Sequence, residues 1–341
     1  MFIPKDILFD RFAADSREGI GPTLLLAPAE WGPSLFDQGL VSDITGNVNQ
    51  NVLDTLNQPA LKAAEHEEQL IGLPYTIQGV VLFRNQGIIT IKPDTFHDLM
   101  MLAQTSSQGD VIGAYLERSF FYSGAHLSGI GGQLIDDNNL PGFNNGKGIE
   151  WLELLRLFEQ AGPTCFFSDD DLERFKAGKV GWIIDGTWNI SVLEDAIGGD
   201  KLAIDPWPVY GDGRLSGYVT SENIYLNAKT NPGDRRAALR FMEYLVSPES
   251  QTLLAENELI PSASHVFLSS SDQSNLMSQA FQALSGGAPY PVHLDISIYR
   301  QNIDDALRAY LEQGVPADQV LQNAQDMILS QSADTAVPTQ P

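Results

Sequence analysis

Along the chain, segments with the hydrophobic spacing of a helix alternate with segments that have the hydrophobic pattern of a strand. Apolar residues recur at the i, i+3, i+4, i+7 spacing of amphipathic helices in stripes that begin at Phe96, Trp151, Ala238, Ile303 and Val320. Short apolar runs that end at proline, glycine or aspartate predict buried strands, among them residues 24–26 and 180–184. The alternation of the two kinds of element predicts an α/β architecture.

Capping signals predict where three of the helices begin. Thr95 and Asp98 form a capping box, and Asn231 and Ser247 each precede a proline in the first helical turn. A further helix is predicted over residues 5–14, and two extended segments, 70–74 and 79–85, are predicted on either side of residues 75–78. The segment 330–341 is polar with two prolines and predicts a disordered tail.

The segment VGWIIDGTW predicts a buried strand that ends in a tight turn at Asp185 and Gly186. Trp188 then lies where the strand stops and a helix begins. Ligands of open α/β folds bind beyond the carboxyl ends of strands, so this position favours a Trp188 that faces a cleft. The alternative is that Trp188 packs inside the core.

Composition narrows the range of functions. The chain has 341 residues, enough for two domains, and its 44 acidic and 20 basic residues give a net charge of −24. This charge argues against nucleic-acid binding and against adsorption to anionic membranes, because both require basic patches. The one cysteine, Cys165, excludes an internal disulfide and a cysteine-based zinc cluster, and we expect it to be a small core residue.

Sequence motifs of enzymes are missing. The five histidines never take an H-x-x-x-H spacing, and the chain has no P-loop, no G-x-S-x-G and no G-x-G-x-x-G. The acidic run Asp169 to Asp171 lacks the ligand spacing of a calcium loop, so we expect it to cap the helix that carries Leu172 and Phe175. The sequence therefore predicts no catalytic residue, no metal and no cofactor.

Several segments, in order, resemble the extracellular solute-binding proteins of bacterial ABC importers, the maltose-binding-like class. They are DRFAADSREGIGPTLLLAPAEWGPSLFDQGLVSDIT, LIGLPYTIQGVVLFRNQGIITIKPDTFHDLMMLA, DLERFKAGKVGWIIDGTW, GYVTSENIYL and LIPSASHV. Three positions depart from the family pattern: Thr23 replaces the usual Asp, Arg84 a common Tyr and Phe96 a common Trp.

The resemblance implies a type II periplasmic-binding-protein fold, in which two α/β lobes are joined by crossover hinge segments and hold the ligand in a cleft. Crossovers are expected near Ile77, Thr220 and Pro289. Lobe 1 would comprise residues 1–77 and 221–288, and lobe 2 residues 78–220 and 289–329. Closure of such lobes is a two-state equilibrium that is biased by the ligand.

The resemblance also implies a set of ligand-binding residues. Carried over position by position, they are Glu30, Trp31, Gln78, Glu117, Phe121, Tyr122, Trp188, Gly217, Tyr218 and Tyr299. Trp31, Trp188 and Tyr299 would stack on the ligand, while Glu30, Gln78 and Glu117 would bind its hydroxyl groups. Aromatic platforms combined with carboxylates and amides suit a carbohydrate, which is the expected ligand.

Two alternatives to a sugar-binding protein stay open. A cationic ligand such as a polyamine fits if several carboxylates converge on the cleft, the candidates being Glu30, Glu117, Asp185, Glu222 and Asp295. A hydrolase with paired carboxylates is less favoured, because local spacing identifies no acid/base pair. We therefore expect a binding protein and not an enzyme.

The resemblance further implies a monomer that works with ABC permease subunits outside the cytoplasm, in the periplasm or anchored by lipid at the cell surface. The start of the chain, MFIPKDILFDRF, lacks the basic and apolar regions of a signal peptide. In the family, an export signal, a strand, a helix and a second strand precede the segment found here at Met1. We accordingly expect the gene to encode roughly 40 to 80 more residues upstream. The alternative is a natural fragment that is completed by another chain.

Overall fold

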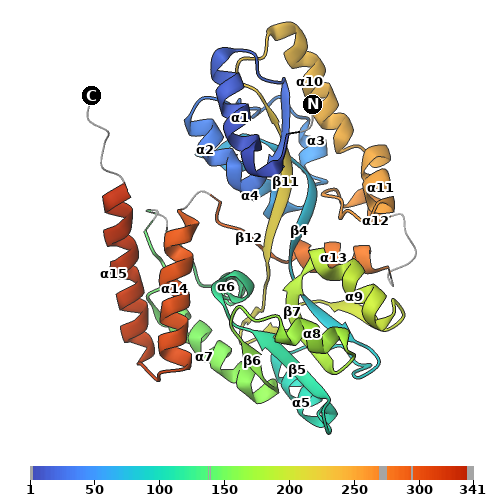
Figure 1. Ribbon diagram of the computed structural model, residues 1–341, viewed down its shortest axis with the longest axis vertical. Helices are drawn as coiled ribbons and strands as arrows, with labels where there is room; N and C mark the ends of the chain where they lie inside the picture. Colours follow the sequence, from blue (N-terminus) through green and yellow to red (C-terminus); the bar gives the residue numbers. More distant parts are fainter. Residues whose placement is uncertain (1–2, 137, 139, 269–274, 293–294, 336–341) are drawn as a thin grey trace. The chain divides into compact units, whose positions relative to one another are not determined.

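The protein folds into two compact units, each of which mixes helices and strands (Figure 1). The computed structural model describes residues 3–136, 138, 140–268, 275–292 and 295–335. Unit 1 comprises Met1–Gln78, Val219–Phe281 and Pro289–His293, and unit 2 comprises Gly79–Tyr218, Gln282–Ala288 and Leu294–Pro341. The predicted α/β architecture is confirmed. The units differ from the predicted lobes around the expected crossover at Pro289. Residues 282–288, predicted for lobe 1, belong to unit 2, and residues 289–293, predicted for lobe 2, belong to unit 1.

The sheet of unit 1 has β11 (Tyr218–Leu226) between β1 (Leu24–Pro28) and β4 (Leu73–Asn85). Strands β1 and β11 are antiparallel, with Leu24 opposite Leu226 and Pro28 opposite Glu222. The other elements of this unit are α1 (Lys5–Glu18), η1 (Ala29–Trp31), α2 (Gly32–Asp37), α3 (Gln50–Leu53), α4 (Gln58–Ala63), β2 (Glu65–His66), β3 (Gln69–Leu70), α10 (Pro232–Leu245), α11 (Pro248–Glu256) and α12 (His265–Leu268). Two apolar clusters form its core, one around Ile44 and Met242 and one around Phe12 and Leu35.

Strand β4 corrects one prediction. The sequence predicts two extended segments separated at residues 75–78, whereas the structure has one strand from Leu73 to Asn85. Backbone hydrogen bonds continue through the predicted break, from Ser262 N–H to the Tyr75 carbonyl and from Ile77 N–H to the Ile260 carbonyl. Residues 75–78 therefore stay in the strand, which carries the chain from unit 1 into unit 2.

In unit 2 the strand order is β4, β7 (Val180–Gly186), β5 (Ile112–Glu117) and β6 (Thr164–Cys165), and β8 (Leu202–Asp205) also pairs with β4. Strand β5 is parallel to both β6 and β7, whereas β4 is antiparallel to β7. The carboxyl ends of β5, β6 and β7 therefore meet at one edge of the sheet, where α/β folds usually bind their ligands.

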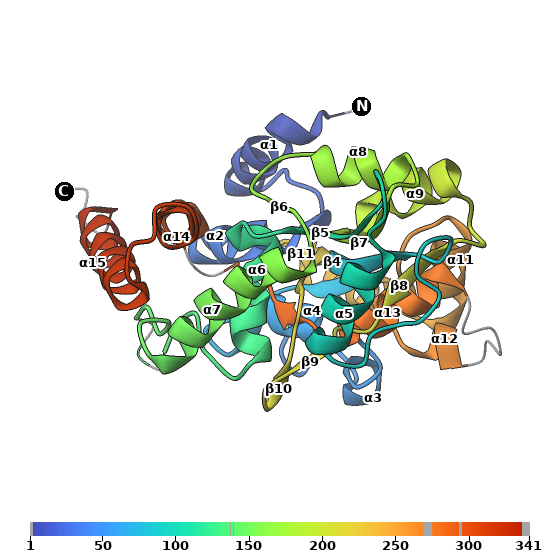
Figure 2. The same ribbon diagram turned by 90° about the horizontal axis from the view of Figure 1, so that it is seen from below.

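Helices cover both faces of this sheet. Figure 2 shows α8 and α9 on one face of β5 and β7 and α5 on the other. The remaining elements wholly inside unit 2 are α5 (Phe96–Ser106), α6 (Phe120–Gly129), α7 (Gly146–Ala161), α8 (Asp170–Lys176), η2 (Thr187–Asn189), α9 (Ile190–Ile197), β9 (Val209–Tyr210), β10 (Gly213–Arg214), α14 (Ile296–Leu311) and α15 (Ala317–Thr335). Two short elements, α13 (Leu276–Ser285) and β12 (Ala288–Pro289), contribute residues to both units.

Local capping signals are confirmed at three helix starts. The Thr95 hydroxyl accepts from Asp98 N–H, and the Asp98 carboxylate accepts from Thr95 N–H, so the capping box of α5 is complete. Asn231 and Ser247 cap α10 and α11 through their side chains. Such a cap stabilises a helix by about 1 kcal/mol.

A buried ion pair ties β4 to β8 inside unit 2. Arg84 Nε donates to both carboxylate oxygens of Asp205, at 3.0 and 2.8 Å, and Arg84 Nη1 donates to the Ile89 carbonyl. The Trp182 indole N–H of β7 donates to the same carboxylate at 2.9 Å. The pair is almost fully buried and hydrogen-bonded on both sides, which is the condition under which a buried charge is tolerated.

The carboxyl-terminal helices α14 and α15 lie side by side (Figure 1). Helix α15 continues to Thr335, into the segment 330–341 that the sequence predicts to be disordered, so this prediction is wrong for residues 330–335. Residues 336–341 lie outside the described residues. None of the helices in the described ranges combines the length and the apolar character needed to cross a bilayer.

Candidate functional site

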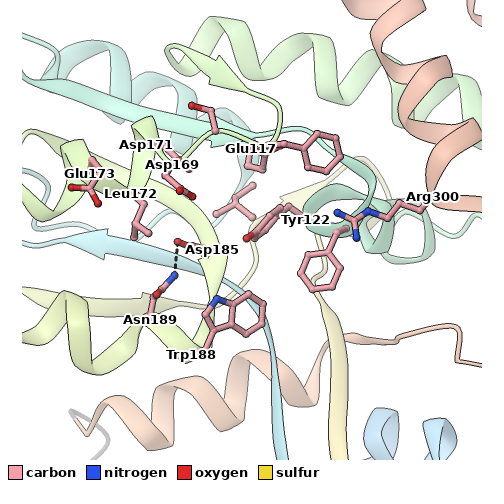
Figure 3. A pocket seen from close by; sticks show the side chains of 14 residues that line it. Glu117, Tyr122, Asp169, Asp171, Leu172, Glu173, Asp185, Trp188, Asn189 and Arg300 are labelled. Carbon is pink, nitrogen blue, oxygen red and sulfur yellow. Dashed lines mark hydrogen bonds between the residues drawn. The ribbon is translucent and has the colours of Figure 1, made fainter. Parts of the chain in front are cut away.

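Unit 2 contains a cavity of about 540 Å³ beyond the carboxyl ends of β5, β6 and β7 (Figure 3). Its size is within the usual range of small-molecule sites. Aromatic rings and acidic side chains dominate its wall, which is formed by Glu117, Phe121, Tyr122, Phe167, Ser168, Asp169, Asp171, Leu172, Glu173, Ile184, Asp185, Trp188, Asn189 and Arg300.

The end of β7 supplies Asp185, and η2 directly after it supplies Trp188. Asp185 accepts a hydrogen bond from Gly186 N–H at 2.6 Å and another from Asn189 Nδ2 at 3.0 Å, drawn in Figure 3. The Trp188 indole lies against the backbone of Gly186, where a Cβ atom would come within 2.0 Å of the ring. Trp188 is 44 % exposed and lines the cavity, so position 186 needs a glycine to let the ring lie in this orientation.

The last residue of β5 is Glu117, and α6 supplies Phe121 and Tyr122. Glu117 Oε1 accepts from Arg118 N–H at 3.0 Å and from Ser119 N–H at 2.7 Å. The first turn of α6 is held from another helix, because Asp304 of α14 accepts from Phe120 N–H at 2.7 Å. These bonds fix the start of α6 and hence the rings that it presents to the cavity.

The aromatic rings of the cavity contact one another. The Phe121 and Trp188 ring centroids are 6.0 Å apart and the planes are tilted by 41°, while Phe121 and Tyr122 meet edge to face at 5.2 Å. The Arg300 guanidinium lies 5.4 Å from the centroid of Phe167, a further ring of the cavity wall. Such rings offer flat apolar surfaces next to polar atoms.

Three carboxyl groups of the cavity wall are buried: Glu117, Asp171 and Asp185 are each at most 5 % exposed. Burial raises the pKa of Asp171 to about 7, and the nearby charges of Asp185 and Glu117 add to the rise. Burial likewise raises the pKa of Asp185 to about 6 and raises that of Glu117. The Cys165 thiol lies at the end of β6, and burial, followed by the charges of Glu117 and Asp171, raises its pKa.

Of the ten residues predicted to bind ligand, four line this cavity: Glu117, Phe121, Tyr122 and Trp188. Glu30 and Trp31 lie in η1 of unit 1, and Gln78 is the last residue of the first segment of that unit. Gly217, Tyr218 and Tyr299 belong to unit 2 but do not line the cavity.

The last three have identifiable structural environments. Tyr218 is 4 % exposed and meets Phe120 edge to face, and Tyr299 is 5 % exposed on the inner face of α14. A Cβ atom at Gly217 would lie 2.0 Å from the Val80 carbonyl, so the close approach of β4 requires glycine there.

Asp171 and Arg300 are functional candidates that the sequence did not single out. The acidic run 169–171 was expected to cap α8, and α8 does begin there, but the Asp169 side chain makes no capping bond and Asp171 lies in the cavity wall. Arg300 is the neighbour of the predicted Tyr299. Successive side chains of a helix point about 100° apart. Tyr299 is therefore buried, while Arg300, one residue later, lines the cavity.

The described part of the chain has no group of three or more histidine, cysteine or acidic residues arranged to hold a metal ion. The carboxylates of the cavity are instead oriented by backbone N–H groups and by Asn189. What this arrangement offers to a ligand is hydrogen-bond acceptors beside aromatic faces.

Comparison with known proteins identifies the family. Residues 3–283 match the family described as "Bacterial extracellular solute-binding protein". The galactooligosaccharide-binding protein of Bacillus subtilis is 22 % identical over 289 residues, which cover 80 % of this chain and 66 % of that protein. The maltooligosaccharide ABC transporter solute-binding lipoprotein of Streptococcus pneumoniae is 24 % identical over 274 residues, covering 72 % of this chain and 60 % of that one. The chain thus spans less than two thirds of the length of either relative.

Solved structures share the fold. The extracellular solute-binding protein from Staphylococcus aureus in complex with maltose superposes with a TM-score of 0.87 at 20 % identity, covering 99 % of this chain and 90 % of that chain. A cyclo/maltodextrin-binding protein complexed with maltotetraose gives a TM-score of 0.85 at 20 % identity, covering 97 % and 88 %. The expected type II periplasmic-binding-protein fold is thereby confirmed. The chain belongs to the bacterial extracellular solute-binding protein family.

Proposed function

We propose that this protein is the substrate-binding component of an ABC importer and that it captures a carbohydrate. The observation that carries the proposal is the cavity of unit 2, where Trp188, Phe121 and Tyr122 lie beside Glu117 and Asp185. Sugars present apolar C–H faces, which stack on aromatic rings, and hydroxyl groups, which donate to carboxylates. Both kinds of partner are present within one wall.

The family and the named relatives support the same proposal. Members of the family bind solutes outside the cell, and the two relatives compared above are named for galactooligosaccharide and maltooligosaccharide. Their low identity leaves the particular sugar of this chain open to experiment.

The roles of the site residues follow from their positions. Trp188 is the stacking platform, held by Gly186 behind it and by Phe121 beside it. Glu117 accepts from sugar hydroxyls with Oε2, and Asp185 does so with Oδ2, which also accepts from Asn189. The contributions predicted for the other residues, Glu30, Trp31, Gln78, Gly217, Tyr218 and Tyr299, remain predictions.

The proposal includes the biological setting. We infer that the protein acts outside the cytoplasm as a monomer, that it delivers its ligand to the permease subunits of a transporter, and that it binds the ligand without converting it. The net charge of −24 is compatible with this setting, because no nucleic acid or anionic membrane is required as a partner.

Isothermal titration calorimetry with a panel of malto-, galacto- and cello-oligosaccharides, with spermidine as a non-sugar, tests the proposal. We expect saturable binding of at least one sugar, and chromatography of the recovered ligand should show it unchanged after a day with the protein. Binding of spermidine without any sugar would overturn the proposal, and so would cleavage of the bound sugar.

A further inference from the structure

Acidic groups outnumber basic groups in the cavity wall. Of its charged side chains only Arg300 is basic, whereas the acidic ones are Glu117, Asp169, Asp171, Glu173 and Asp185. Figure 3 shows Asp169, Asp171 and Asp185 together on one side of the cavity and Arg300 on the other side, beyond Tyr122. The basic group is therefore separated from the acidic side of the cavity.

The three buried carboxyl groups have no basic partner. Among the residues that the structure describes, no side-chain nitrogen of lysine, arginine or histidine lies within 4 Å of a carboxylate oxygen of Glu117, Asp171 or Asp185, while Arg300 Nε is 4.0 Å from Asp304 Oδ2. Glu117 and Asp185 accept hydrogen bonds from backbone N–H groups, and Asp185 also accepts from the Asn189 amide. Neutral donors of this kind satisfy oxygen atoms without balancing the charge.

A neutral sugar would leave this imbalance in place. When it enters, it displaces water from the carboxylates, and removing water from an uncompensated charge is unfavourable. A positively charged group on the ligand compensates the charge directly, and hydrogen bonds between ionised groups are about twice as strong as neutral ones. The aromatic rings add to this, because a cation near an indole or phenol face is attracted to it.

We propose that the cavity selects a sugar that carries a protonated amino group, with the ammonium placed among Glu117, Asp171 and Asp185 and the sugar ring against Trp188. This inference rests on the proposed function and names its ligand class more narrowly. The site itself rests on the cavity and its aromatic rings, and the unbalanced carboxylates determine which sugar fits it.

The experiment uses trios of ligands that differ only at the amino position. One trio is the β-1,4-linked tetrasaccharide of glucosamine, its N-acetylated form and the corresponding glucose tetrasaccharide; a second is galactosamine, N-acetylgalactosamine and galactose. Calorimetry at pH 7.5 ionises most of Asp171, whose pKa is about 7, and leaves more than half of an amine with a pKa near 7.7 to 8.0 protonated. We expect the amine of at least one trio to bind about tenfold or more tightly than both neutral forms, which is the fold-change of one charge-assisted hydrogen bond.

The outcomes distinguish this inference from the proposed function. Equal or tighter binding of the neutral members, or of neutral malto-oligosaccharides, overturns the selection for an amine and leaves the carbohydrate function standing. Spermidine binding without any sugar overturns both, and so does the absence of binding throughout the panel.

Variants identify the groups responsible. Asp171→Asn and Asp185→Asn keep the shape of the side chain and remove its charge, so each should reduce the ratio of amine affinity to neutral-sugar affinity about tenfold. Asp170→Asn is the matched control, because Asp170 is exposed on the same turn of α8 and does not line the cavity. An equal loss in all three variants, or no loss in the first two, would overturn the assignment.

Discussion

Replacing Asp171 by asparagine should stabilise the ligand-free protein at alkaline pH. Burial raises the pKa of this carboxyl from 3.8 to about 7, so the folded protein holds the proton to a higher pH than the unfolded chain does. The contribution of this group to stability is therefore fully present below about pH 4 and is lost as the pH rises through 7. Between pH 5 and pH 8 the loss amounts to roughly 2 to 3 kcal/mol.

The asparagine variant does not titrate and should escape this loss. Its free energy of unfolding relative to the wild type should rise by roughly 2 to 3 kcal/mol between pH 5 and pH 8. At pH 8 the variant will be more stable than the wild type by less than the full pKa shift implies. The reason is that the ionised carboxylate of the wild type, in the first turn of α8, is itself stabilised by about 0.3 to 1 kcal/mol by the helix dipole. The same dipole term applies to the exposed control Asp170→Asn.

Urea denaturation of wild type, Asp171→Asn and Asp170→Asn at pH 5 and pH 8, without ligand, measures the difference. The prediction is refuted if the free energies of unfolding of the wild type and of Asp171→Asn differ by the same amount at pH 5 and at pH 8. It is also refuted if Asp170→Asn shows the same pH dependence as Asp171→Asn. Asp185 and Asp304, whose pKa values are also raised to about 6 by burial, contribute to the slope of all three proteins and cancel in the comparison.

Three further predictions concern individual side chains. Trp188→Ala should weaken binding of the preferred oligosaccharide by roughly 1 to 3 kcal/mol in calorimetry. The unfolding midpoint of the ligand-free protein should stay nearly unchanged, because the ring is 44 % exposed. A large drop in this midpoint with affinity retained would instead make Trp188 a core residue. Gly186→Ala should weaken the same binding because its Cβ displaces the indole, and wild-type affinity together with an unshifted tryptophan emission spectrum would contradict this. Asp205→Ala should destabilise unit 2 by about 3 to 5 kcal/mol in a denaturation experiment because it leaves Arg84 buried without its partner; Arg84→Met with Asp205→Leu, which removes both charges, should recover part of the loss.

Local signals predicted much of the secondary structure. The capping box of Thr95 and Asp98 and the prolines after Asn231 and Ser247 act within one helical turn, so the sequence alone contains the information. The strand-to-helix turn before Trp188 was predictable for the same reason.

The failed predictions depended on contacts between distant segments. Nothing near residues 75–78 reveals that Ile260 and Ser262 will hydrogen-bond to them and keep β4 continuous. The acidic run at 169–171 has a sufficient local explanation as a helix start, so its second role in the cavity wall is visible only once β5 and β7 bring Glu117 and Asp185 beside it. Arg300 was not singled out because the family pattern pointed to its neighbour Tyr299, and adjacent residues of α14 face different sides of the helix.

The division of the chain into interleaved segments affects how the protein must fold. Unit 1 needs strand β11 beside β1, so its sheet stays incomplete until residues near 226 have been synthesised. Unit 2 in turn waits for α14, whose Asp304 holds the start of α6. Closing loops of this length is entropically costly and slows folding. A chain emerging from the ribosome therefore has no complete unit for most of its synthesis, and apolar strands such as β7 stay exposed to aggregation or to chaperones until the last third of the sequence arrives.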